Sequence, residues 1–167
     1  MDLVELNELF DYKNKLMEDI CSNAEIVKLI TDNENSPVPN KSLPYSRVFP
    51  YEFVPETVDD GQTFICFDVD IADVVNKTFY IPVVYIWVFT HKSKLRLLEG
   101  GVRIDKITSE LSKILNGSRY YGLGELNLKS VSRFSPITDY QGRASVYYAK
   151  DFNNLGSKHP PSSRKYR

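Results

Sequence analysis

Three aspartates and two histidines are the residues of this chain that could bind a metal ion. Asp68, Asp70 and Asp73 lie close together in the sequence, and hard cations prefer several oxygen ligands. Apolar residues alternate with Asp68 and Asp70, however, which is typical of the solvent-facing side of a strand. His91 and His159 have no cysteine or acid at ligand spacing, whereas a zinc site needs three or four ligands. We therefore expect no metal and no cofactor.

Cysteine and glycine residues carry the other candidate chemistry. Cys21 and Cys66 form no CxxC pair and have no nearby base, so we interpret both as buried thiols in a reducing compartment rather than nucleophiles. Gly122 and Gly124 follow a predicted helix and precede a predicted strand. A phosphate-binding loop requires the opposite order, so these glycines indicate a turn. We expect the protein not to be an enzyme.

Basic residues gather after the longest apolar run of the chain. The set is Lys92, Lys94, Arg96 and Arg103. Such a set is usually a solvated loop, and a net charge of −1 argues against a dedicated nucleic-acid binder. If copies of the chain formed a ring, the same four residues would be candidates to face a lumen through which DNA passes.

Length and composition predict one domain at residues 1–155. The chain has 167 residues, 42% of them hydrophobic and 26% charged, which is ordinary for a globular domain. Its longest apolar run, 79–89, is far shorter than the roughly 20 residues that cross a bilayer, so no membrane contact is expected. Residues 156–167 are basic and carry almost nothing to bury, which predicts a flexible tail.

The first third of the chain predicts helices followed by an extended arm. Apolar spacing indicates a helix over residues 6–20 and a second short helix capped by Ser22 or Asn23. Prolines then interrupt residues 32–60, which excludes a continuous helix or central strand. The aromatic side chains of this arm must cover either the chain's own sheet or a neighbour's, and are candidate subunit contacts: Tyr45, Phe49, Tyr51 and Phe53.

The rest of the chain predicts an α+β fold. Strands are expected at 63–71, 78–90, 123–134 and 143–152, with a helix at 102–116 and a turn at 139–142. We expect a mainly antiparallel, four-stranded sheet packed on helices, with the second strand central and covered on both faces.

Four short segments carry a resemblance to a known family. Residues 103–107 (RIDKI) through 115–117 (LNG), with 122–126 (GLGEL) and 139–143 (DYQGR), follow in an order of elements that resembles the small neck proteins of tailed bacteriophages. The similarity covers roughly residues 63–152 and is strongest to the tail terminators. It leaves the proline-rich arm and the basic tail unexplained.

The resemblance implies a structural role in the virion. Tail terminators form rings, typically hexamers, that cap the tail tube and join it to the head connector, after assembly in the host cytoplasm. The implied partners are other copies of the chain, the tail tube protein, the connector proteins and passing genomic DNA. A stopper or adaptor ring subunit is the alternative within the neck, and a small non-viral binding or enzymatic domain is the alternative of another class.

Overall fold

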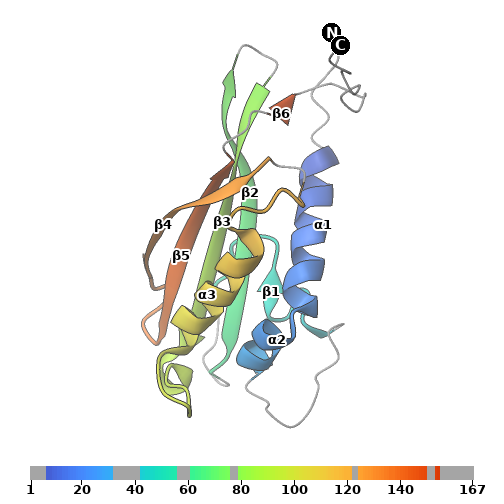
Figure 1. Ribbon diagram of the computed structural model, residues 1–167. Coiled ribbons are helices and arrows are strands. Elements are labelled where there is room, and N and C mark those ends of the chain that lie inside the picture. The colour runs from blue at the N-terminus through green and yellow to red at the C-terminus, as the bar shows by residue number, and fades with distance from the viewer. Residues whose placement is uncertain are drawn as a thin grey trace, which may run out of the picture.

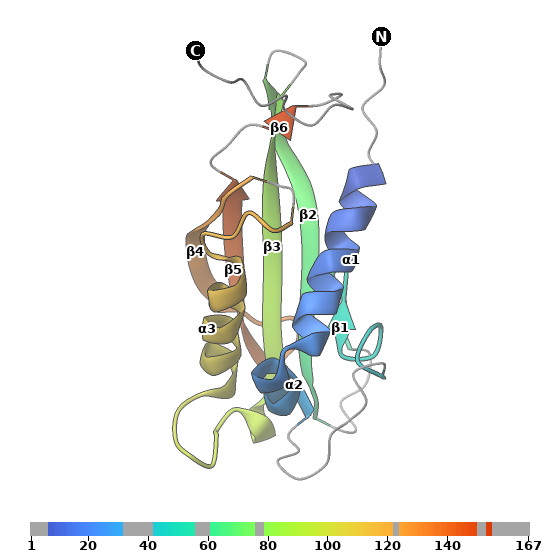
Figure 2. The same cartoon turned by 45° about the vertical axis from the view of Figure 1, so that its right-hand side comes forward.

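A single mixed sheet carries three helices on one of its faces (Figures 1 and 2). The structure is a computed structural model, and it describes residues 7–31, 42–55, 61–75, 79–121, 124–149 and 153–154. The helices are α1 (Asn7–Ser22), α2 (Ala24–Thr31) and α3 (Arg103–Leu115). The strands are β1 (Val48–Phe49), β2 (Thr63–Val75), β3 (Phe79–His91), β4 (Leu126–Phe134), β5 (Tyr140–Ala149) and β6 (Asn153–Asn154). The predicted tail and His159 lie outside the described residues.

The sheet has the order β1-β2-β3-β5-β4, and β6 pairs with the far end of β3. The predicted α+β class and the antiparallel pairing of the four long strands are confirmed. The strand count is wrong, because β1 adds to β2 in parallel and β6 adds to β3. Both extra strands are two residues long, which is too short to leave an alternating pattern in the sequence.

Strands β2 and β3 continue past the end of β5 as a narrow ribbon, which the two residues of β6 join at Phe79 and Tyr80. β5 pairs with β3 only from Val83 to His91, while the β2–β3 ladder runs on to Val75 and Phe79. Pro82 lies just beyond β5 and pairs with Ile71, where the register shifts. This is the bulge position expected for a proline, because the missing N–H has no ladder partner there.

The helices and one face of the sheet enclose the main core. Leu16 and Ile20 of α1 and Ile107 and Leu111 of α3 are almost fully buried. They pack in one cluster with alternate residues of the sheet, among them Ile65, Phe67, Val84, Ile86, Val88 and Tyr147. Each fully buried side chain of this size contributes about 1.5–3 kcal/mol, so this face holds the fold together.

Within the described part of the chain, the arm packs on one end of the opposite face of the sheet. The arm residues Phe49 and Phe53 stack with centroids 4.1 Å apart and pack over Phe64, Phe89 and Tyr140. Farther along this face the side chains remain partly exposed. The expectation that β3 is covered on both faces is met at Val83 and Phe89, which are fully buried, whereas Tyr85 and Trp87 between them are only half-buried by the described residues.

Several local details differ from the sequence expectations. Asn23, rather than Ser22, caps α2, since its Oδ1 accepts a hydrogen bond from Ile26 N–H at 3.1 Å. Phe10, placed on the apolar face, is 70% exposed. Glu110, expected in water, is buried and pairs with Lys113 at 2.7 Å.

The observed bounds of β4 and β5 also differ from the predicted ones. The turn between β4 and β5 occupies residues 135–139, because the β5 ladder already starts at Tyr140, opposite His91. Leu128 and Val131, expected to face a core, are 40% and 46% exposed. A register shift lies between Leu128 and Ser130, and β4 is the edge strand, so these side chains have no layer to pack against.

Candidate interaction surface

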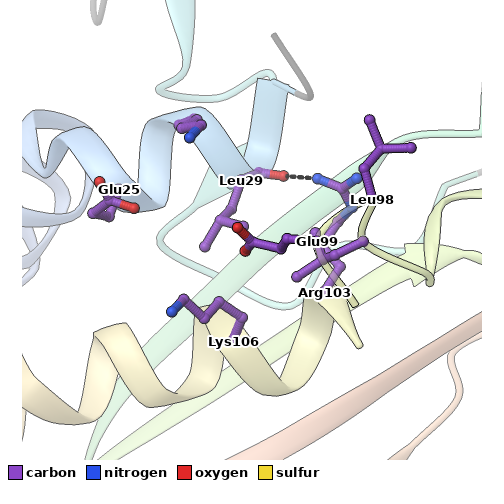
Figure 3. Close-up of a pocket in the computed structure, with 8 residues that line it drawn as sticks. Glu25, Leu29, Leu98, Glu99, Arg103 and Lys106 are labelled. Atoms are coloured by element: carbon purple, nitrogen blue, oxygen red, sulfur yellow. Dashed lines mark hydrogen bonds between the residues drawn. The ribbon is translucent and has the colours of Figure 1, made fainter. Parts of the chain in front are cut away.

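The basic set divides into a buried member and a peripheral group. Arg103, expected to face a lumen, is only 5% exposed. Its Nε donates to the carbonyl of Lys94 at 2.8 Å and its guanidinium nitrogen to the carbonyl of Leu29 at 2.7 Å (Figure 3). The first contact joins the start of α3 to the preceding loop, and the second joins it to the last turn of α2. Arg103 is therefore a structural residue, because its charge is used to cap backbone carbonyls.

The other basic residues stay near the surface. Lys92 is exposed and pairs with Asp139 at 2.7 Å, and this contact holds the pKa of the Asp139 carboxyl below its usual value. Arg96 is exposed, while Lys94 is half-buried. Because the charge of Lys92 is already paired and Lys94 is half-buried, Arg96 is the member of the set best placed to contact a partner.

The aromatic residues of the arm are also split by the structure. Phe49 is buried and Phe53 half-buried against the chain's own sheet, which leaves neither free for a neighbour. Tyr45 and Tyr51 are 62% and 46% exposed. Tyr45 has a φ of 60°, a conformation uncommon outside glycine, within the turn that leads into β1. Of the four predicted contact residues, the two tyrosines remain candidates.

The residues considered for metal chemistry do not converge within the described residues. Asp68 pairs with Lys13 of α1 at 2.5 Å, Asp70 is exposed, and the side chain of Asp73 lies outside the described part of the structure. Over the described residues, no three histidine, cysteine, aspartate or glutamate side chains form a group that could hold a metal ion.

Both cysteines are buried and unpaired. Burial raises the pKa of the Cys21 thiol to about 11 and that of Cys66 to about 12. Since the thiolate is the nucleophile, such thiols are almost entirely in the unreactive form at neutral pH. This agrees with their prediction as buried core thiols.

Apolar side chains of β3 and β5 remain partly exposed on the sheet face that carries the arm. Tyr85 and Trp87 of β3 stack with centroids 5.9 Å apart. Their ladder partners on β5 are Val146 and Ala144, both half-buried, and Tyr148 beside them is 36% exposed. We call these five residues the aromatic face. The sequence already indicated such a face, because the residues of β3 are apolar on both sides of the strand, whereas β2 alternates apolar and polar residues.

Two hollows flank the start of α3. A small one of about 150 Å³ lies between α2 and the loop that precedes α3, with Glu25, Leu29, Glu99 and Lys106 around it (Figure 3). A larger one of about 560 Å³ lies between α3 and the β4–β5 turn. The small hollow mixes acidic and basic side chains with no cluster suited to catalysis.

Comparison with known families gives the affiliation of the chain. The model of the YomW family matches residues 23–149, which is most of the chain. The chain belongs to the YomW family. This family consists of phage-derived genes of Bacillus, so the protein is phage-associated. The predicted association with a phage is thereby confirmed. The family match does not say where in the virion the protein would lie.

The YomW match coincides with structural boundaries. It begins at Asn23, the cap of α2, and ends at Ala149, the last residue of β5. The family segment therefore contains α2, α3 and strands β1 to β5, together with the whole aromatic face. No curated protein matches the chain. Among the described residues, no helix combines the length and apolar character that crossing a bilayer requires.

Proposed function

We propose that this YomW-family protein is a structural protein of the phage neck, namely a tail terminator. Its copies join in a ring, a hexamer, that caps the tail tube and docks to the head connector. The observation that carries the proposal is the aromatic face. Stacked Tyr85 and Trp87 lie on the sheet face that carries the arm, beside the cluster of Phe49 and Phe89, and both are only half-buried by the described residues. Aromatic side chains are enriched where proteins meet.

The edges of the sheet support the same role. No described strand pairs with the outer side of β4, although its first residues, Leu126 and Leu128, bond to residues 116–118 after α3. On the other edge, β1 covers only Ile65 and Cys66 of β2. Open edges leave backbone groups free to pair with another chain. A ring satisfies such groups by symmetry, because each subunit meets an identical neighbour.

The projecting ribbon adds a means of reaching a neighbour. Residues 70–75 of β2 and 79–82 of β3 extend past β5 (Figure 1). The ribbon gains only the two residues of β6, which pair with Phe79 and Tyr80. Because so narrow a sheet is only marginally stable in water, packing against another subunit or the tube would stabilise it. Contact with passing DNA, if the ring surrounds it, would use Lys92, Lys94 and Arg96 without the buried Arg103.

Electron microscopy of lysates from a phage lacking this gene tests the proposal. A terminator stops tube growth, so its loss should give filled heads beside separate tails of irregular, excessive length. Tails of normal length beside emptied heads would instead indicate a stopper or adaptor. The gene supplied from a plasmid is the control and should restore joined particles. Intact infectious particles without the gene would contradict any neck function.

A further inference from the structure

The loop that joins β3 to α3 presents a bare leucine at its tip. Leu98 is 99% exposed, although its neighbour Leu97 is buried. The loop is closed by two backbone hydrogen bonds of 3.1 Å between Leu97 and the glycines that follow, Gly100 and Gly101. These glycines have φ values of 97° and 88°, which other residues rarely adopt. The turn is thus held in a shape that leaves Leu98 exposed, while the side chain of Glu99, also exposed, extends over the small hollow toward Leu29 and Lys106 (Figure 3).

The larger hollow near the start of α3 has the complementary composition. Three apolar residues line part of it, namely Val102, Ile104 and Phe134. The rest of the lining is mostly polar and includes Asp105 and two cations, Arg133 and Arg143. Arg143 is occupied, because its Nε donates to Asp105 at 2.7 Å. Arg133 is exposed and forms no ion pair with any residue that the structure describes. The hollow therefore offers an apolar patch with one available positive charge.

We propose that Leu98 and Glu99 of one copy insert into this hollow on a neighbouring copy. Leu98 would lie against Val102 and Phe134, and the Glu99 carboxylate would pair with Arg133. An apolar side chain would meet apolar side chains, and an acid would meet a base. The charge pair would also fix how the two copies align. The inference rests on the proposed ring and names the contact between its subunits.

The geometry favours a head-to-tail contact over self-occupation. Val102 lines the hollow, yet Leu98, four residues earlier, is almost fully exposed, so it does not fill its own copy's hollow. We call Leu98 and Glu99 the knob. The knob and the hollow are different surfaces of one subunit. A contact between different surfaces repeats from copy to copy and closes into a ring when the rotation allows.

Light scattering on the purified full chain, coupled to size exclusion, tests the contact. Leu98→Asp should lower the population of the wild-type oligomer at least tenfold at equal concentration. The fold should be unaffected, because Leu98 packs against almost nothing. Phe10→Asp, at another highly exposed apolar position, is the matched control and should leave the oligomer intact. Rings that survive Leu98→Asp unchanged would overturn the inference and leave the ring itself standing.

A charge exchange gives a second, independent measurement. Glu99→Arg and Arg133→Glu should each reduce the oligomer, and the double variant should recover most of it. Absence of recovery, with both single variants folded, would contradict the assigned pair.

Cysteine cross-linking covers the case in which the wild-type chain elutes as a monomer. A variant with Leu98→Cys and Thr138→Cys places one thiol on the knob and one beside the hollow, while Cys21 and Cys66 are buried. Mild oxidation at high concentration should give a ladder of linked copies, and the pair Phe10→Cys with Thr138→Cys should not. No ladder would overturn the contact. The lysate phenotype judges the neck function separately, since it does not depend on which residues join the copies.

Discussion

Arg103 shows how a single side chain can be mistaken for a binding residue. In the sequence it is one of four cations in a short stretch, and nothing local distinguishes it from Arg96. The distinction comes from Leu29, which is remote in the sequence but whose carbonyl lies 2.7 Å from the guanidinium. A contact of this kind depends on the packing of α2 against α3 and cannot be read from spacing.

Replacement of Arg103 by lysine should therefore destabilise the fold. Arg103→Lys keeps the charge but loses the planar fork that serves two carbonyls, so we expect the free energy of unfolding to fall by about 1–3 kcal/mol. Urea denaturation followed by circular dichroism measures the change. Arg96→Lys, at an exposed position, is the control and should stay within about 0.5 kcal/mol of wild type. Equal midpoints for both variants would show that Arg103 has no bracing role.

The tyrosine at position 121 makes a similar long-range connection. Its hydroxyl donates to Asp19 of α1 at 2.6 Å, which ties the segment after α3 to the first helix. Burial raises the pKa of Tyr121 above its ordinary value, and the Asp19 carboxylate adds to the effect. The protonated phenol is therefore favoured in the fold, and its stabilising contribution would be lost only as strongly alkaline pH ionises the group.

Among the elements, Gly142 sets how closely β3 and β5 approach. A Cβ built at this position would lie 2.2 Å from the carbonyl oxygen of Val88 and 2.8 Å from the Cβ of Phe89. Both neighbours belong to the central strand, and the carbonyl is backbone that cannot rotate away. A side chain at position 142 would therefore collide with β3, next to the aromatic cluster that includes Phe64, Phe89 and Tyr140.

The variant Gly142→Ala should accordingly separate the two strands locally. We expect a loss of about 1–3 kcal/mol in the free energy of unfolding, as for other overpacked sites. Amide hydrogen exchange along β3 and β5 should quicken near Val88 more than near Val84. Gln141→Ala, one residue earlier and exposed, is the control. Unchanged exchange at Val88 would mean that the strands accommodate the methyl group without moving.

Helices and strands with a periodic apolar pattern were predictable from the sequence. Those that exist only because they pair with another strand were not. The apolar run of β3, the stripe of α3 and its glycine stop at Gly117 (φ 78°) all follow from local sequence. β1 is two residues long and exists only because Val48 and Phe49 meet Ile65 and Cys66. The start of β5 at Tyr140 is likewise set by its pairing with His91. The turn before β5 therefore lies earlier in the chain than the sequence predicted.

At the scale of the molecule, the two faces of the sheet differ in what completes them. Three helices pack on one face, whereas the described part of the arm packs on the end of the other around Phe49 and Phe53. The sequence indicated a strand that is apolar on both sides, but it could not show which of its side chains the described residues leave half-buried. Tyr85 and Trp87 are such side chains, and they are the main reason for the proposed contact with a partner.

The tryptophan on the aromatic face can report whether assembly covers it. Trp87 is the single tryptophan of the chain and is half-buried beside Tyr85. If the ring or its junction with the tube packs on this face, acrylamide quenching of Trp87 should fall severalfold between free subunit and assembled particle, with a blue shift of emission as water is excluded.

The knob provides the matching control for that measurement. Leu98→Asp should keep the subunit free, and its Trp87 should stay as quenchable as in the wild-type monomer, because the substitution lies on another part of the molecule. Quenching that is equal in free and assembled wild-type protein would show that the aromatic face remains bare in the particle. The open sheet face could then no longer support the assembly role, and the argument for a ring would rest on the strand edges and the knob alone.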